Sequence, residues 1–137
     1  MRARIAAAAG LAALALGGCG SAAGGTSDTG TPAETADCGK VSLGQGESTI
    51  PAAPLQCLAD ASAAGSPATL AVLALTVEGD VITTTYTVVD TRRVRMIVDS
   101  TQDAFAGDGA GITQQTCDLG TDGGQITVTN CTDPEPF

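Results

Sequence analysis

The first 37 residues cannot contribute to a folded core, and this limits the rest of the chain more than any other feature. Residues 1–19 carry two arginines and an apolar run from Ile5 to Leu16. Residues 20–37 contain no side chain larger than Glu and no strongly apolar one, so they cannot bury enough surface to offset the entropy of ordering. About 96 residues remain to fold, which predicts one small domain.

The apolar run is too short to span about 30 Å of hydrocarbon, which takes about 20 helical residues. Its charged start and the small residues at its end are typical of a secretory signal peptide. The sequence Leu16-Gly17-Gly18-Cys19 resembles a bacterial lipobox. The resemblance implies that residues 1–18 are removed and that the Cys19 sulfur carries a diacylglyceryl group. Because two acyl chains anchor stably, we expect attachment to the extracytoplasmic face of the cell membrane.

Residues 19–37 are then the lipidated cysteine and a disordered tether, residues 38–133 the folded domain, and residues 134–137 a tail. Two prolines in the tail fix φ and remove donors, so we expect that it cannot continue a strand. After removal of the signal peptide, four basic and fifteen acidic residues remain, giving a net charge of −11.

Composition excludes several functions. The whole chain has a net charge of −9, whereas nucleic-acid binding needs a basic surface, so no nucleic-acid partner is expected. The chain has no His, which excludes a His-based triad or metal site. Its only aromatic residues are Tyr86, Phe105 and Phe137, too few for a stacking platform.

Hydropathy patterns predict an α+β fold. Pro51 and Pro54 suit the first turn of a helix that ends at Gly65. Apolar or alternating segments predict strands over 70–77, 81–89, 94–98, 112–119 and 125–131. The expected inward residues of the second strand are Ile82, Tyr86 and Val88, and the expected outward ones are Thr83, Thr85 and Thr87. We therefore expect one helix packed on an antiparallel meander of about five strands.

Four cysteines remain beside the lipidated Cys19. Outside the cytoplasm they imply two disulfides, for which three connectivities exist. We favour Cys117–Cys131, because the last two predicted strands bring these positions together, and this leaves Cys38–Cys57. The spacings do not resemble those of a zinc site, so neither a metal nor a cofactor is expected.

Two weaker patterns are candidate ligand contacts. Asp99, Asp103 and Asp108 lie in one polar loop, but their spacings of four and five residues and the absence of a closing Glu favour a solvated loop over a calcium site. Alternation places Arg93 and Arg95 on one solvent face, where they could contact an anion. Exposed ion pairs with neighbouring acidic residues are the simpler interpretation.

The segment from Thr76 to Cys131 resembles domains of unknown function in small Gram-positive lipoproteins. The similar stretches are TVEGD, ITTTYTVVD and VRMIVDSTQDAFAG, together with Cys117 and Cys131. This resemblance implies an envelope location and a small disulfide-bonded fold, and it implies no activity.

No nucleophile–base pair is evident in the sequence, so we predict no catalytic residues. The pattern favours a non-catalytic domain that binds a protein or peptide of the cell envelope. The alternative is an envelope accessory hydrolase that uses the carboxylates of the Asp99–Asp108 loop; two acidic groups roughly 5–10 Å apart in a cleft would favour it.

Overall fold

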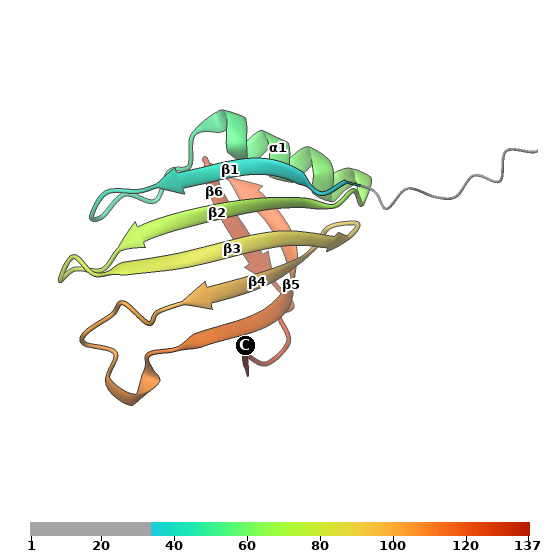
Figure 1. The fold of residues 1–137 in the computed structure, drawn as a ribbon. Coiled ribbons are helices and arrows are strands. Elements are labelled where there is room, and N and C mark those ends of the chain that lie inside the picture. The colour runs from blue at the N-terminus through green and yellow to red at the C-terminus, as the bar shows by residue number, and fades with distance from the viewer. Residues whose placement is uncertain (1–33) are drawn as a thin grey trace, which may run out of the picture.

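Residues 34–137 form a curved β-sheet with one helix along a face, in a computed structural model that describes these residues (Figure 1). The elements in chain order are β1 (Ala36–Ser42), α1 (Ala52–Ala64), β2 (Ala68–Leu75), β3 (Val81–Asp90), β4 (Arg93–Asp99), the 3₁₀ helix η1 (Gly107–Gly109), β5 (Ile112–Asp122), β6 (Gln125–Thr129) and β7 (Glu135–Pro136). Residues 1–33 lie outside the described residues, and with them the predicted signal peptide, Cys19 and most of the predicted tether.

The sheet is mixed. Its order is β1-β2-β3-β4-β5-β6, and β7 also pairs with β5. β1 and β2 are parallel, whereas each of the other paired strands is antiparallel to its neighbour. The predicted helix and five strands are present, but the simple antiparallel meander is wrong, because the described residues are mostly β and contain seven strands. A parallel pair needs a crossover connection, and α1 provides it between β1 and β2.

α1 begins directly after Pro51 and ends at Gly65, as the sequence predicts. Pro51 has φ −53°, and its ring provides a fixed angle at the start of the helix. Gly65 has φ +66°, a left-handed conformation that favours glycine, and its N–H donates to the C=O of Ser62 (3.2 Å). A side chain at Gly65 would also meet Oγ1 of Thr91 at 2.7 Å. The turn between β3 and β4 therefore packs closely against the end of α1.

The core lies between α1 and the sheet. Its buried apolar residues are Cys38, Val41, Ile50, Leu58, Ala68, Leu70, Val72, Val88, Val94 and Cys117. Val88 is buried and Tyr86 packs against this cluster, as predicted, whereas Ile82 is as half-buried as Thr83, Thr85 and Thr87, which were expected to face outward. Burial raises the pKa of the Tyr86 hydroxyl. The helix thus packs on one face of the sheet.

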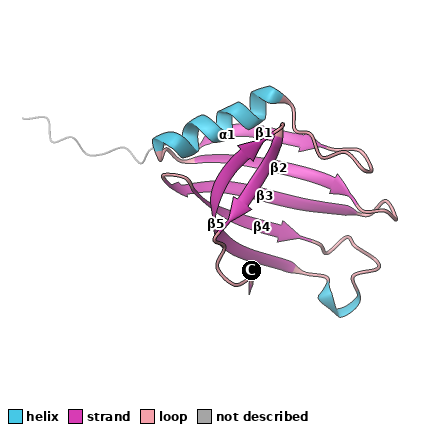
Figure 2. Cartoon of the chain, turned by 180° about the vertical axis from the view of Figure 1, so that it is seen from behind, coloured by secondary structure: helices cyan, strands magenta, loops and turns pink. Residues whose placement is uncertain are grey.

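β5 is the longest strand, and it bends out of the sheet. It pairs with β4 as far as Asp118 and with β6 from Asp118 to Asp122. From behind, the β5–β6 hairpin crosses the face of the sheet and reaches toward α1 (Figure 2). Gly123 and Gly124 have φ of +55° and +80°, which suits a two-residue type I′ turn. The C=O of Gly124 accepts from the N–H of Ile50 (2.8 Å), so the turn is held beside the start of α1.

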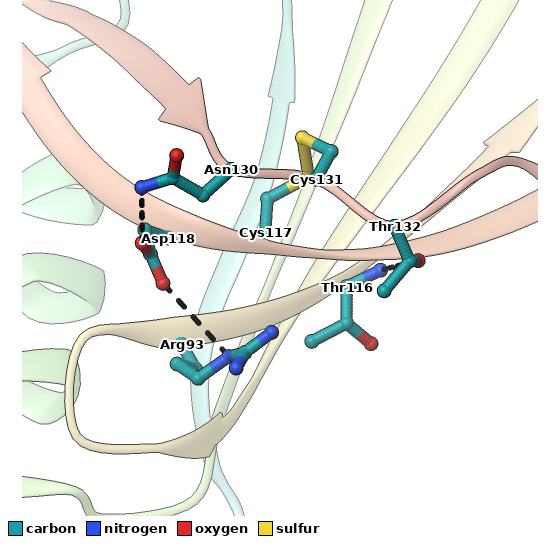
Figure 3. The surroundings of a disulfide bond; sticks show 7 residues. All are labelled: Arg93, Thr116, Cys117, Asp118, Asn130, Cys131 and Thr132. Atoms are coloured by element: carbon teal, nitrogen blue, oxygen red, sulfur yellow. Dashed lines mark hydrogen bonds and ion pairs between the residues drawn. A yellow bond between two sulfur atoms is a disulfide. The ribbon is translucent and has the colours of Figure 1, made fainter.

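The predicted disulfide pairing is confirmed. Cys38–Cys57 ties the edge strand β1 to α1, with its Cα atoms 5.6 Å apart. Cys117–Cys131 joins β5 to the segment that follows β6, with its Cα atoms 4.0 Å apart (Figure 3). The two bridges therefore fasten opposite ends of the folded sequence.

The chain around the second bridge is also held by hydrogen bonds (Figure 3). Asn130 has φ +49°, and its side-chain amide donates to Oδ2 of Asp118 (2.8 Å). Thr116 donates its N–H to Oγ1 of Thr132 (3.1 Å), and its C=O accepts from the N–H of Thr132 (2.9 Å). The segment after β6 thus follows β5 back along its length.

The C-terminal residues differ from the prediction. Residues 134–137 were expected not to continue a strand, yet Glu135 and Pro136 form β7 beside β5. Proline lacks a donor, but it is compatible with an edge strand whose missing N–H faces away from its partner. The N–H of Phe137 donates to the C=O of Ile112 (2.9 Å) and supplies the adjacent bond. At the other end, β1 begins at Ala36, two residues before the expected start of the domain.

Candidate functional site

The acidic residues of the predicted ligand loop do not converge. Asp99 accepts hydrogen bonds from the hydroxyl (2.6 Å) and the N–H (3.0 Å) of Thr101, and these two bonds hold the pKa of its carboxyl below the usual value. Asp103 accepts from the N–H of Phe105 (2.9 Å), and Asp108 lies in η1. In the described part of the chain, no three His, Cys, Asp or Glu residues are close enough to hold a metal ion.

Arg93 and Arg95 lie on one face of β4, since side chains two positions apart share a face. Nε of Arg93 lies 3.9 Å from Oδ1 of Asp118, and both of these side chains are more than a third exposed. An exposed pair of this kind contributes about 0–1 kcal/mol. Neither arginine lines the pockets described below. The arrangement corresponds to a surface ion pair.

A groove runs between α1 and the end of β5, and we call it the α1–β5 groove. It consists of two adjoining pockets of about 290 Å³ and about 440 Å³ that share Ala59 and Thr121. The first pocket is lined by Ala59, Ser62, Ala63, Arg92, Leu119, Gly120 and Thr121. The second is lined by Thr49, Ile50, Pro51, Ala52, Leu55, Gln56, Ala59, Thr121 and Gly124.

The groove is hollow because the helix face beside β5 carries small side chains. Ala52, Ala59 and Ala63 are seven and four residues apart, so they lie on the same face of α1. At 1.5 Å per residue, this face is about 16 Å long. Leu55 adds an apolar wall and Gln56 a polar rim. A strand of four or five residues would match this length, at about 3.3 Å per residue.

Arg92 closes one end of the groove with its main chain. It has φ +57° in the turn between β3 and β4. Its N–H donates to the C=O of Ser62 on α1 (2.9 Å), and its C=O accepts from the N–H of Leu119 on β5 (2.8 Å). One residue thus links the helix to the strand. β4 pairs with β5 from Arg93 onward, opposite Asp118 and the residues before it. Beyond Leu119, toward Asp122, no strand lies beside β5 on this side.

The edge of β5 that faces the groove is unpaired. Asp122 pairs with Gln125 across the two-residue turn, and in an antiparallel pair successive residues direct their N–H and C=O to opposite sides. Both main-chain groups of Thr121 therefore point away from β6 and into the groove. These two groups and the C=O of Leu119 have no hydrogen-bond partner within residues 34–137. The groove thus contains one unused donor and two unused acceptors.

The Arg92 end of the groove combines a cationic residue with a buried hydroxyl. Ser62 is 3 % exposed, and its Oγ has no hydrogen-bond partner in the part of the chain that the structure describes. A buried polar atom without a partner is uncommon and calls for an explanation. Arg92 lines the same pocket, and its guanidinium forms no ion pair with any described residue. This end is therefore suited to a negatively charged or hydrogen-bond-accepting group.

None of these groove residues stands out in the sequence as a site. Arg92 adjoins the Arg93 and Arg95 pair, and this is the one feature of the sequence that points to it. Ser62 has the appearance of an ordinary helix residue. The exposed edge at Thr121 depends on where β4 begins, and no residue type predicts that position.

The chain matches no known protein family, no characterised protein and no solved structure. Among residues 34–137, no helix is long and apolar enough to cross a membrane.

Proposed function

We propose that this protein is a membrane-anchored extracytoplasmic lipoprotein whose folded part is a non-catalytic domain that binds an envelope protein or peptide in the α1–β5 groove. The observation that carries the proposal is the unpaired edge of β5 beside a hollow helix face. A polypeptide main chain supplies the donors and acceptors that such an edge lacks. Because the chain has no His and Ser62 has no hydrogen-bonded base among residues 34–137, binding is a better account of this groove than acyl transfer.

The anchor predicts where a Cys19 variant is found. With Cys19→Ala in the full-length protein, we expect the protein to leave the membrane fraction and to lose labelling by a fatty-acid probe, since no acyl chains remain to hold it. Fractionation of cells followed by immunoblotting measures this. Ser21→Ala, two residues further on, is the control and should remain attached and labelled. A Cys19→Ala protein that is as membrane-bound as the wild type would contradict the anchor.

The groove itself is tested with two adjacent alanines of α1. Ala63 is exposed and lines the first pocket, whereas Ala64 is exposed and lines neither pocket. We expect Ala63→Trp to fill the pocket and to abolish recovery of the envelope partner, and Ala64→Trp to leave recovery unchanged. Cross-linking in intact envelopes followed by purification measures the recovery, with a tether-only protein as background.

Thermal melting of both tryptophan variants shows whether the helix tolerates the substitution. Equal melting temperatures with selective loss of the partner in Ala63→Trp support the groove. If the two variants recover the same protein equally well, the partner binds elsewhere and the α1–β5 groove is not the binding site.

A further inference from the structure

The partner's chemistry can be specified further if the α1–β5 groove is the binding site. We infer that the groove takes the C-terminal segment of a polypeptide as an added β-strand. This strand runs antiparallel to β5, and its free carboxylate lies at Arg92. The inference rests on the proposed binding function and deepens it.

The free main-chain groups of β5 define an extended peptide as the ligand. Thr121 presents both its N–H and its C=O on one side, which is the pattern of a hydrogen-bonded residue pair in an antiparallel sheet. Leu119, two residues away, presents its C=O on the same side. A peptide residue opposite Thr121 satisfies both main-chain groups of that residue.

The groove admits a chain end at Arg92 and not a continuing chain. The N–H of Leu119 is already bonded to the C=O of Arg92, and β4 occupies the position beside β5 from Arg93 onward. Arg92 fills the position opposite Leu119, so a peptide that pairs with Thr121 and runs antiparallel to β5 meets Arg92 there. Its last residue has to lie directly before that position, unless the chain turns away from the sheet.

Charge determines which chain end fits. Arg92 lines the pocket, and its guanidinium forms no ion pair with any described residue. A guanidinium donates charge-assisted hydrogen bonds to a carboxylate. A peptide in the opposite, parallel direction would instead place its ammonium group beside Arg92, which is repulsive.

The walls select small or medium apolar side chains near the end of the peptide. Alternate residues of a strand point to the same side, so every second side chain of the added strand faces α1. There the small side chains of Ala59 and Ala63 leave room for the two pockets. Leu119 and Leu55 provide apolar contact. A charged side chain in this space would lose its hydration without gaining an ion pair.

The other free strand edges are less suited to this ligand. β1 has an irregular register between Asp37 and Lys40, and its edge carries the lysine itself; both features discourage pairing. β6 is an outer strand of five residues, and its free edge lies on the side away from β5. Among the strand edges of residues 34–137, only the edge at Thr121 combines an unpaired donor and acceptor with a helix wall and a cation.

The test uses arrays of random five-residue peptides, attached at the N-terminus, that end either in a free carboxylate or in a carboxamide. We expect the full-length protein, purified as cells produce it, to bind a subset of the carboxylate array with apolar final residues and none of the carboxamide array. For peptides selected in this way, Arg92→Gln should weaken binding about tenfold or more, and Arg95→Gln should leave it unchanged. Arg95 lies on the face of β4 that does not line the groove.

Hydrogen exchange followed by NMR tests the added strand directly. Binding of a selected peptide should slow exchange of the Thr121 amide, and the amides of Ile126 and Val128 in β6 should be unaffected. Equal binding to both arrays, protection at β6 instead of Thr121, or equal effects of the two arginine variants would overturn the inference. If Ala63→Trp abolishes partner recovery while neither array binds, the groove is still a binding site, and only the assignment of a peptide C-terminus as its ligand is wrong.

Discussion

Replacement of Leu58 by alanine is expected to lower the free energy of unfolding by about 3 kcal/mol, within the range of ~2–5 kcal/mol usual for a buried leucine. Leu58 is 0 % exposed and belongs to the same buried cluster as Leu70 and Val94. The alanine leaves a cavity between α1 and the sheet. The paired strands and the Cys38–Cys57 bridge limit how far the surroundings can collapse into it. Urea denaturation followed by circular dichroism measures the loss.

The matched control is Leu75→Ala. Leu75 ends β2 and is 37 % exposed, so the same deletion removes less buried surface and should cost less than about 1 kcal/mol. A domain of this size has a total stability of about 5–15 kcal/mol, which makes a loss of 3 kcal/mol easy to detect. Equal denaturation midpoints for the two variants would show that α1 does not pack on the sheet through Leu58.

Loss of the Cys117–Cys131 bridge is expected to cost about 3 kcal/mol as well. Its two cysteines are 14 residues apart, and the chain-entropy relation gives about this value for a loop of 15 residues. The double variant Cys117→Ala/Cys131→Ala also removes a sulfur that is fully buried in the wild type. Urea denaturation of the double variant against the oxidised wild type measures the effect.

The double variant Cys38→Ala/Cys57→Ala is the companion measurement. Its cysteines are 19 residues apart, so the entropic cost is similar, but the local effect differs. We expect β1, an edge strand bonded only to β2, to lose hydrogen-exchange protection while β3 and β4 retain theirs. Peptide mapping without reductant should find only the 38–57 and 117–131 links. Free thiols or a link from Cys57 to Cys117 would contradict the framework.

Local sequence signals were sufficient for the parts of the fold that depend on near neighbours. The helix was predictable because Pro51 and Gly65 mark its two ends. The strands β2 to β6 were predictable because each is apolar or alternates and is bounded by turn residues. The bridge Cys117–Cys131 followed from the hairpin between its cysteines.

The remaining parts depend on distant neighbours. β1 has no continuous apolar run and contains Gly39 with φ +96°. It becomes a strand by pairing with β2, which follows it in the sequence only after α1. β7 has two residues, one of them a proline, and its pairing with β5 stabilises it. The edge at Thr121 is unpaired because β4 begins at Arg93, and the C=O of Leu119 is unpaired because Arg92 directs its N–H to α1. No residue type in the sequence predicts such a main-chain arrangement.

The position of Cys38 within β1 has a mechanical consequence. Cys38 is the third residue of the strand, so tension applied through the N-terminal segment reaches the sulfur bridge almost as soon as it enters the fold. From there a covalent path leads to Cys57 on α1, the helix that forms one wall of the groove. Pulling between the N-terminus and a ligand in the groove would therefore load covalent bonds first. The hydrogen bonds that β1 makes with β2 after Cys38 would be spared.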